Sequence, residues 1–385
     1  MSDDITPFRI DVPEAELEDL RERLRRTRWP EAETVDDWSQ GIPLDYTRRL
    51  CEHWLARYDW RAAESRLNRF PQFLITLDNL DIHFVHVRSP HAGALPLVMT
   101  HGWPGSIVEF QKVIEPLTDP VAFGGDAADA FHVVCPSLPG YGFSGKPGRT
   151  GWGSGATADA WDQLMARLGY PRYAAQGGDW GAQVTTALAM RHPDHLAGIH
   201  LNMVIAFPDP SDELTEREQA AMASVGYYDR WDSGYSKEQS TRPQTVGYGL
   251  VDSPAGLCAW IVEKFWAWTD CDGDPANVLT FDEMLDNVML YWVTGAGASS
   301  ARFYWESFRQ PFLGPVHVPA GCSIFPKEIF RPSRRWAERQ LLNLQYWNEL
   351  DKGGHFAAFE QPETFVNEVR ASFRPLRSRQ FAAAR

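Results

Sequence analysis

The residues that point most directly to chemistry are Gly177-Gly178-Asp179-Trp180-Gly181, which follow a short apolar run. They fit the G-x-S-x-G turn that joins a strand to a helix and lifts one reactive side chain above the strand end, with aspartate in place of serine. Glycines on both sides permit the strained backbone that such a turn requires. The alternative is that Asp179 only caps the helix that follows.

An acid and a histidine follow Asp179 in the chain order that this kind of turn requires. Glu328 comes just after an apolar run that ends at Phe325, and His355 lies in the glycine-containing loop 352–356. A single glutamate or histidine is most often a surface or core residue without a catalytic role. Because both occur in the required order and at expected strand ends, we interpret Asp179, Glu328 and His355 as a catalytic set.

A second loop, His101-Gly-Trp-Pro104, also follows an expected strand. Such a loop supplies backbone N–H groups that bind a developing negative charge on oxygen. We therefore expect the N–H groups of Trp103 and Trp180 to point at one oxygen of the Asp179 carboxyl. The alternative is an ordinary turn, since glycine and proline are common where strands end. We expect His101 to be structural rather than catalytic.

An aspartate in the position of the nucleophile changes the reaction class. A carboxyl with a reference pKa of about 3.9 is ionised at pH 7 and needs no base before it attacks, and its natural electrophile is an alkyl carbon. The attack joins substrate and enzyme as an ester, which a water molecule must then hydrolyse. We expect His355 to deprotonate that water and Glu328 to orient the imidazole.

These loops require strands that end at one edge of a sheet. Short apolar runs at 95–99, 131–135, 173–176 and 199–203 alternate with helical patterns, and the alternation resumes at 322–325. This order is typical of a doubly wound, mostly parallel sheet. The sequence therefore predicts an α/β fold with the reactive residues at the carboxyl ends of its strands.

Two segments interrupt the alternation of strands and helices. Residues 5–72 have the leucine spacing of helices, and a hairpin around Asp78-Asn79 leads from them into the sheet. Residues 209–315 are mostly helical, polar and aromatic, which indicates an inserted helical lid. We divide the chain into an N-terminal extension that wraps core and lid (1–80), a first core part (81–208), the lid (209–315) and a second core part (316–385).

The composition limits the kinds of binding partner that the protein can have. The 385 residues carry a net charge of −14, which disfavours nucleic acid and anionic membrane surfaces. No apolar run is long enough to span a membrane, and Met1–Asp4 lack the layout of a secretory signal, so we expect a soluble, cytoplasmic protein. The five scattered cysteines predict neither disulfides nor a zinc site, and no motif for a metal or an organic cofactor is present.

Several stretches in the right order resemble the microsomal-type branch of the α/β-hydrolase epoxide hydrolases, in a soluble form without the membrane anchor. These stretches are 7–12, 25–30, 101–106, 177–181, 286–292 and 325–328. The resemblance covers almost the whole chain and implies hydrolysis of a small-molecule epoxide to a vicinal diol, with water as the only co-substrate. It assigns the nucleophile to Asp179 and the activation of water to His355 and Glu328.

The resemblance also implies two lid tyrosines that bind and protonate the epoxide oxygen. They correspond to Tyr235 and Tyr304, and a phenol with a reference pKa of about 10 suits this task. Tyr227, Tyr228 and Tyr248 lie near Tyr235 in the sequence. The alternative for any lid tyrosine is a packed aromatic ring with its hydroxyl in water.

Two alternative functions stay open. A haloalkane dehalogenase shares the fold and the aspartate nucleophile but releases halide, which needs N–H donors such as indoles rather than phenols. A non-catalytic ligand-binding protein of the same fold has no evident need for all three of Asp179, Glu328 and His355.

The sequence says less about the substrate. Six tryptophans in and around the expected lid indicate a bulky, aryl-substituted epoxide, although such rings are more often core residues: Trp152, Trp260, Trp266, Trp268, Trp292 and Trp305. The chain also resembles epoxide hydrolases of actinomycete antibiotic pathways, including enediyne pathways, which implies a biosynthetic role, with detoxification as the alternative. Relatives of this type are commonly dimers, so a homodimer is an open expectation.

Overall fold

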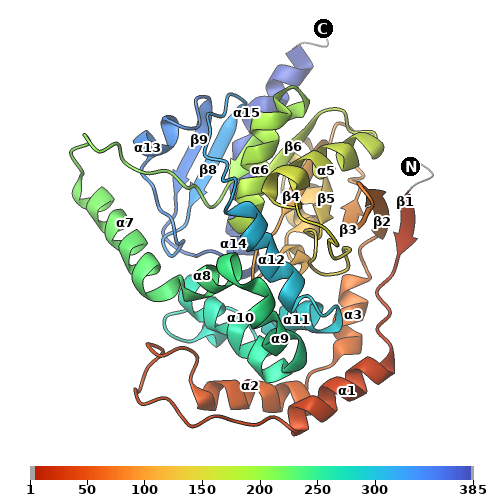
Figure 1. Cartoon of the computed structure of the whole chain (residues 1–385). Helices are drawn as coiled ribbons and strands as arrows, with labels where there is room; N and C mark the ends of the chain where they lie inside the picture. Colours follow the sequence, from red (N-terminus) through yellow and green to blue (C-terminus); the bar gives the residue numbers. More distant parts are fainter. Residues whose placement is uncertain (1–4, 383–385) are drawn as a thin grey trace.

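The structure, a computed structural model, describes residues 5–382, with side chains as far as residue 377. Nine strands form one sheet: β1 (Ile5–Phe8), β2 (Gln72–Leu77), β3 (Leu80–Val87), β4 (Leu95–Thr100), β5 (Phe131–Pro136), β6 (Tyr173–Gly177), β7 (Leu196–Leu201), β8 (Ala320–Ile324) and β9 (Leu344–Glu349). Their order is β1-β2-β3-β5-β4-β6-β7-β8-β9 (Figure 1). Met1–Asp4, on which the expectation about a secretory signal rests, lie outside the described residues.

The sheet is parallel from β5 to β9 and antiparallel from β1 to β5. Strands β4 to β8 are buried almost throughout, which explains why each is a continuous apolar run rather than an alternating one. The doubly wound, mostly parallel sheet expected from the sequence is therefore confirmed.

The first strands differ in part from the expectation. β2 and β3 form the expected hairpin, and Asp78 and Asn79 at its turn have φ of 48° and 60°, as a two-residue turn between antiparallel strands requires. The prediction that residues 5–72 are helical is wrong at its start. Ile5–Phe8 instead pair with β2, because the outer edge of β2 offers backbone groups that need hydrogen-bond partners.

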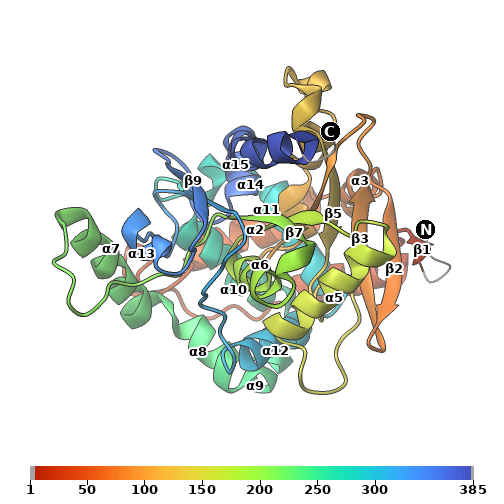
Figure 2. The same ribbon diagram turned by 90° about the horizontal axis from the view of Figure 1, so that it is seen from above.

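Helices cover both faces of the sheet (Figure 2). On one face lie α5 (Ser154–Arg167) and α6 (Asp179–Arg191). On the other lie α4 (Ile114–Thr118), α14 (Ala357–Glu360) and α15 (Pro362–Ala382), and α13 (Arg334–Glu338) connects β8 to β9. This arrangement leaves the carboxyl ends of the parallel strands open for other elements.

The inserted segment covers those strand ends. Between β7 and β8 the chain forms α7 (Glu216–Tyr227), the π-helical turn η5 (Tyr228–Asp232), α8 (Gly234–Thr241), α9 (Pro243–Asp252), α10 (Pro254–Trp268), α11 (Phe281–Val293) and α12 (Gly297–Ser307). The N-terminal helices are α1 (Glu14–Arg25), α2 (Leu44–Ala56) and α3 (Trp60–Leu67). Figure 1 shows α9 to α11 between the sheet and helices α1 and α2.

A buried carboxylate joins the N-terminal helices to the inserted segment. Asp286 on α11 accepts hydrogen bonds from Tyr58 Oη and Arg66 Nη2, both at 2.8 Å. Burial raises the pKa of Asp286 in spite of these two donors. Two further polar contacts join the same parts of the chain: Tyr46 with Asp274 and His53 with Asp282.

The structure also bears on the cysteines and on membrane-spanning helices. All five cysteines are buried, and none of them is in a disulfide. Within residues 5–382 no helix is long and apolar enough to cross a membrane. The cytoplasmic location and the homodimer stay predictions.

Replacing Asp286 by Ala should lower the free energy of unfolding by about 2–4 kcal/mol, because the Tyr58 hydroxyl and the Arg66 guanidinium lose a buried partner. Asp286→Asn keeps an acceptor and should cost less. Urea unfolding followed by circular dichroism measures both. Glu338→Gln removes an exposed ion pair with Arg334 and should change stability by less than about 1 kcal/mol. An equal loss in Asp286→Ala and Glu338→Gln would contradict the prediction.

Candidate active site

Asp179 lies in the tight turn between β6 and α6. Its φ is +47°, a strained left-handed conformation for a residue with a side chain. The neighbouring glycines allow the turn, since a Cβ on Gly177 would lie 2.1 Å from the carbonyl oxygen of Gly181, and one on Gly181 would lie 1.8 Å from that of Thr100. Gly178 is the N-cap of α6, so the alternative that Asp179 is only a helix cap is wrong.

Two groups hold the Asp179 carboxyl. Its Oδ1 accepts a hydrogen bond from the N–H of Trp103 at 2.8 Å, and its Oδ2 lies 3.3 Å from His355 Nε2. Residue 102 has to be glycine, because a Cβ there would lie 2.1 Å from Oδ1. The expected hydrogen bond from Trp103 is confirmed, and the one from the N–H of Trp180 stays a prediction.

His101 belongs to the same loop as Trp103, and both of its ring nitrogens contact backbone groups. Its Nε2 accepts a hydrogen bond from the N–H of Leu138 at 3.2 Å, and its Nδ1 lies 3.0 Å from the carbonyl oxygen of Gly102. Burial lowers the pKa of His101 to about 4. A neutral ring with its proton on Nδ1 satisfies both contacts.

Glu328 and His355 come from the loops after β8 and β9. A parallel bridge between Lys327 and Gly354 joins these loops and brings the two side chains together. His355 Nδ1 lies 2.7 Å from Glu328 Oε1, and the Glu328 side chain is completely buried, with 0% exposure. Glu328, His355 and Asp179 therefore form one continuous chain of contacts.

The protonation of His355 depends on these two carboxylates. Burial alone lowers the pKa of an imidazole, but the negative charges of Glu328 and Asp179 outweigh burial and raise the pKa of His355 well above 6.5. At neutral pH the imidazole is therefore positively charged and lies between two negative groups.

Tyr235 on α8 and Tyr304 on α12 reach the same place from the inserted segment. The Tyr235 ring stacks on Trp103 at 4.8 Å between ring centroids, and the Tyr304 ring meets Trp180 edge to face at 4.7 Å. Burial raises the pKa of both phenols well above 10, and the charge of Asp179 raises these pKa values further. Both hydroxyls are therefore protonated and available as donors.

The neighbouring tyrosines separate into two kinds. Tyr227 and Tyr248 are 62% and 68% exposed. The hydroxyl of Tyr228 lies 2.9 Å from that of Tyr235, and burial raises the pKa of Tyr228 to about 12. Among the tyrosines near Tyr235 in sequence, Tyr228 is thus the one whose hydroxyl meets it.

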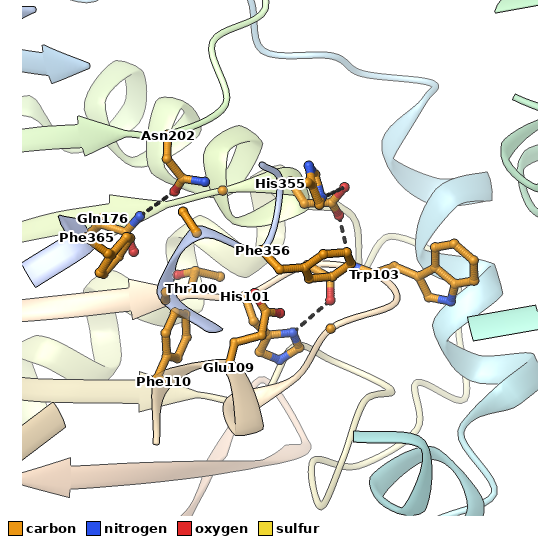
Figure 3. A pocket seen from close by; sticks show the side chains of 16 residues that line it. Thr100, His101, Trp103, Glu109, Phe110, Gln176, Asn202, His355, Phe356 and Phe365 are labelled. Atoms are coloured by element: carbon orange, nitrogen blue, oxygen red, sulfur yellow. Dashed lines mark hydrogen bonds and ion pairs between the residues drawn. The ribbon is translucent and has the colours of Figure 1, made fainter. Parts of the chain in front are cut away.

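A small cavity of about 20 Å³ adjoins Asp179 and His355 (Figure 3). Glu109, Gln176 and Asn202 are among its polar lining residues. Burial raises the pKa of Glu109 to about 8, so its carboxyl is mostly protonated at pH 7. The Gln176 amide donates to Asn202, while Gln176 Oε1 has no hydrogen-bond partner among the described residues. The cavity is large enough for one water molecule and polar enough to hold it.

Sequence reasoning missed Glu109 and gave Tyr228 no role of its own. Glu109 is the one charged residue in the apolar stretch 107–110 directly after the HGWPGS loop, and that signal could have found it. Tyr228 carries no such signal, because its contact with Tyr235 depends on the π-helical turn η5 that it begins.

Comparisons with known proteins agree with this geometry. The family model described as Epoxide hydrolase N terminus matches residues 5–110, and the model described as alpha/beta hydrolase fold matches residues 96–238. A protein of Stigmatella aurantiaca (strain DW4/3-1), provisionally named an epoxide hydrolase, is 57% identical over 378 residues, which are 97% of this chain and 86% of that protein. Epoxide hydrolase 1 of Oryctolagus cuniculus is 36% identical over 398 residues, 95% of this chain and 88% of that protein.

This chain belongs to the epoxide hydrolases of the α/β-hydrolase fold.

Solved structures agree with this family. Juvenile hormone epoxide hydrolase from the silkworm Bombyx mori has a TM-score of 0.89 at 31% identity and covers 98% of this chain and 95% of its own. Aspergillus niger epoxide hydrolase has a TM-score of 0.88 at 33% identity and covers 96% of both chains. The expected fold and enzyme class are confirmed, and neither a haloalkane dehalogenase nor a non-catalytic binding protein is favoured.

A large cleft of about 1180 Å³ leads to the tyrosines of this epoxide hydrolase. Tyr228 and Tyr235 lie in its wall, and so do three of the six tryptophans expected in and around the lid: Trp260, Trp266 and Trp268. The other three lie elsewhere: Trp152 and Trp305 line a separate cleft of about 440 Å³, and Trp292 lies under Arg23. Three of the six tryptophans therefore line the large cleft, and Trp292 and Trp305 lie elsewhere in the inserted segment.

Replacing Asp179 by Asn should lower the pKa of His355, because one of the two charges that raise it is removed. The measurement is a pH titration of the imidazole signals by nuclear magnetic resonance in both proteins. The exposed His317 is the internal reference, and its titration should not differ between them. An unchanged titration of His355 would show that Glu328 alone sets its charge.

Proposed function

We propose that this epoxide hydrolase converts a bulky, aryl-substituted epoxide into a vicinal diol in two steps, through an ester between Asp179 and one ring carbon. The supporting observation is the position of the Asp179 carboxyl, with one oxygen on the N–H of Trp103 and the other 3.3 Å from His355. A carboxylate held in this way has one oxygen ready to attack and the other already in the place where negative charge must later be stabilised.

In the first step Asp179 Oδ2 attacks a ring carbon, and the bond between that carbon and the epoxide oxygen breaks. The alkoxide that leaves takes a proton from Tyr235 or Tyr304, which together orient the ring for in-line attack. The hydroxyl of Tyr228, 2.9 Å from that of Tyr235, can return a proton to it. Oδ1 remains on the N–H of Trp103 and becomes the carbonyl oxygen of the ester.

Formation of the ester prepares His355 for the second step. The ester removes the negative charge of Asp179, so the pKa of His355 falls and the imidazole gives up its proton to solvent. The tyrosine pair regains from solvent the proton that it gave to the alkoxide. Neutral His355 then takes a proton from water, which attacks the ester carbonyl carbon while the N–H of Trp103 binds the charge on Oδ1. Collapse of this intermediate breaks the bond to the diol oxygen, which takes the proton from His355 and leaves Asp179 as a carboxylic acid. The proton of that acid passes to the now neutral His355, which restores the carboxylate and the charged imidazole.

The cavity beside Asp179 and His355 is the proposed place of the attacking water. Its volume of about 20 Å³ fits one water molecule. His355, the proposed base, lines this cavity. Glu109 also lines it, with a carboxyl that burial keeps mostly neutral at pH 7. A neutral carboxyl can accept and donate one hydrogen bond each, so it can hold the water without competing with His355 for charge.

The substrate proposal rests on the large cleft. Its aromatic wall and its volume of about 1180 Å³ suit a bulky or polycyclic epoxide, and residues 209–315 act as the lid that forms most of this wall. A substrate of this size fits the modification of a secondary metabolite, which we propose as the physiological role.

The two-step mechanism is tested with styrene oxide and the bulkier trans-stilbene oxide. The wild type should form diol from both, faster from the bulkier one, and Asp179→Ala should lose at least about 1000-fold in kcat/KM. His355→Gln should accumulate protein heavier by one substrate, with the added mass on the peptide that contains Asp179. In a single turnover of the wild type in ¹⁸O-water, the label should enter the Asp179 carboxyl and not the diol.

His317→Gln, an exposed histidine, is the control and should behave as the wild type. Label found directly in the diol after one turnover would mean that water attacks the epoxide in a single step. Absence of diol from either epoxide would contradict the proposed substrate class.

Glu109→Leu should slow hydrolysis of the ester by at least about tenfold and leave its formation unchanged, because the leucine removes a polar partner of the water. Glu109→Gln keeps the shape and the neutral charge and should stay near the wild type at pH 7. Rapid-quench mass spectrometry of the ester measures both steps. The wild-type rate of hydrolysis should change as pH rises through about 8, where the Glu109 carboxyl ionises, and Glu109→Gln should lack that change. Equal slowing of both steps in Glu109→Leu would assign the residue to packing only.

A further inference from the structure

Two histidines and two aspartates face one another at the end of α6 that lies away from Asp179. His192 caps the single turn of 3-10 helix η4 (Pro193–His195), and His195 is its last residue. With three residues per turn, side chains three apart in a 3-10 helix lie on the same side. Their rings are accordingly nearly parallel, with centroids 6.1 Å apart and an angle of 13° between the planes. Both imidazoles therefore face the same neighbour.

That neighbour is Asp162 on α5. Its Oδ1 lies 2.7 Å from His195 Nδ1, and its Oδ2 lies 3.5 Å from His192 Nδ1. One ligand atom from each of these three residues lies within 4.8 Å of the others. Ligand atoms around a tetrahedral Zn²⁺ are roughly 3.3 Å apart, given bonds of about 2.0–2.1 Å. The contact of His192 is close to this value, and the half-exposed His195 can move outward by the few tenths of an ångström required.

The residues behind the cluster orient its ligand atoms. His192 Nε2 lies 2.7 Å from Asp159 Oδ1, and Arg191 holds that aspartate through both of its oxygens. A proton on Nε2, shared with Asp159, leaves the lone pair of Nδ1 for a metal, as in many zinc sites where a carboxylate supports the histidine. Tyr173 donates a hydrogen bond to Asp162 Oδ1 at 2.9 Å and fixes the carboxylate.

We propose that Asp162, His192 and His195 form a binding site for Zn²⁺, with water as the fourth ligand. Two imidazoles and one carboxylate suit Zn²⁺ and related transition metals, whereas Mg²⁺ and Ca²⁺ prefer oxygen ligands alone. Asp159 and Arg191 neutralise each other, so Asp162 leaves the cluster negative when both histidines are neutral. The scattered cysteines and the absence of a regular ligand spacing in the sequence predicted no zinc site.

The site is separate from the catalytic residues and does not rest on the proposed mechanism. Asp179 begins α6 and Arg191 ends it, so the length of the helix, about 20 Å, lies between the two places. A bound ion would link α5 to the turn between α6 and β7. Because the ligand atoms come together only in the folded chain, Zn²⁺ would stabilise the native state as its concentration rises.

The test uses the full chain after treatment with EDTA. Isothermal titration with ZnCl₂ should saturate at one Zn²⁺ per chain, and the melting temperature should rise with Zn²⁺ concentration. Co²⁺ in place of Zn²⁺ should give the visible absorption of a tetrahedral ion. His195→Gln and Asp162→Asn should abolish these effects, and Asp159→Asn should weaken binding by about 10- to 100-fold.

His91→Gln is the matched control, because His91 lies 2.8 Å from Asp119 in a histidine–aspartate pair of the same kind. It should bind Zn²⁺ as the wild type does. Absence of saturable binding in the wild type, or equal binding by His195→Gln, would overturn the proposal and leave two ordinary histidine–aspartate pairs. Should the variants fail to fold, the imidazole signals of the wild type decide, since Zn²⁺ must shift those of His192 and His195 and leave those of His91 in place.

Discussion

The geometry of the site depends on one carboxylate that a backbone N–H and an imidazole must both reach. Asp179 meets this requirement only through a left-handed backbone at the end of β6. Glycines at 102 and 181 are needed because Asp179 and Thr100 approach so closely that no side chain would fit. The sheet supplies the rest of the constraint, since parallel strands bring loops that are far apart in sequence to the same edge.

Charge links the residues of the site as closely as geometry does. His355 owes its positive charge to Glu328 and Asp179 together, so a change at either carboxylate changes the imidazole. In the proposed reaction, formation of the ester removes the charge of Asp179. The pKa of His355 then falls in the step that needs His355 as a base. The order of the two steps would then follow from electrostatics alone, without movement of a loop.

Local patterns in the sequence were enough to predict most of the fold and the expected residues of the site. The GGDWG turn, the HGWPGS loop and the order of Glu328 and His355 are short-range signals, and the structure brings these groups together as expected. Features that depend on packing between distant segments were not predictable in this way. Ile5–Phe8 become a strand only because β2 has a free edge, Tyr228 meets Tyr235 only through η5, and the tryptophans divide between two clefts.

The contacts of Asp286 have a consequence for hybrids between members of this family. Tyr58 lies between α2 and α3 and Arg66 lies on α3, while the carboxylate that they share belongs to the inserted segment that lines the large cleft. An insert grafted from a relative without that carboxylate would leave the Tyr58 hydroxyl and the Arg66 guanidinium without this acceptor. The N-terminal helices and the inserted segment are far apart in sequence but depend on the same carboxylate. A hybrid that takes its inserted segment from a relative, in order to change the substrate range, should therefore take its N-terminal helices from the same relative.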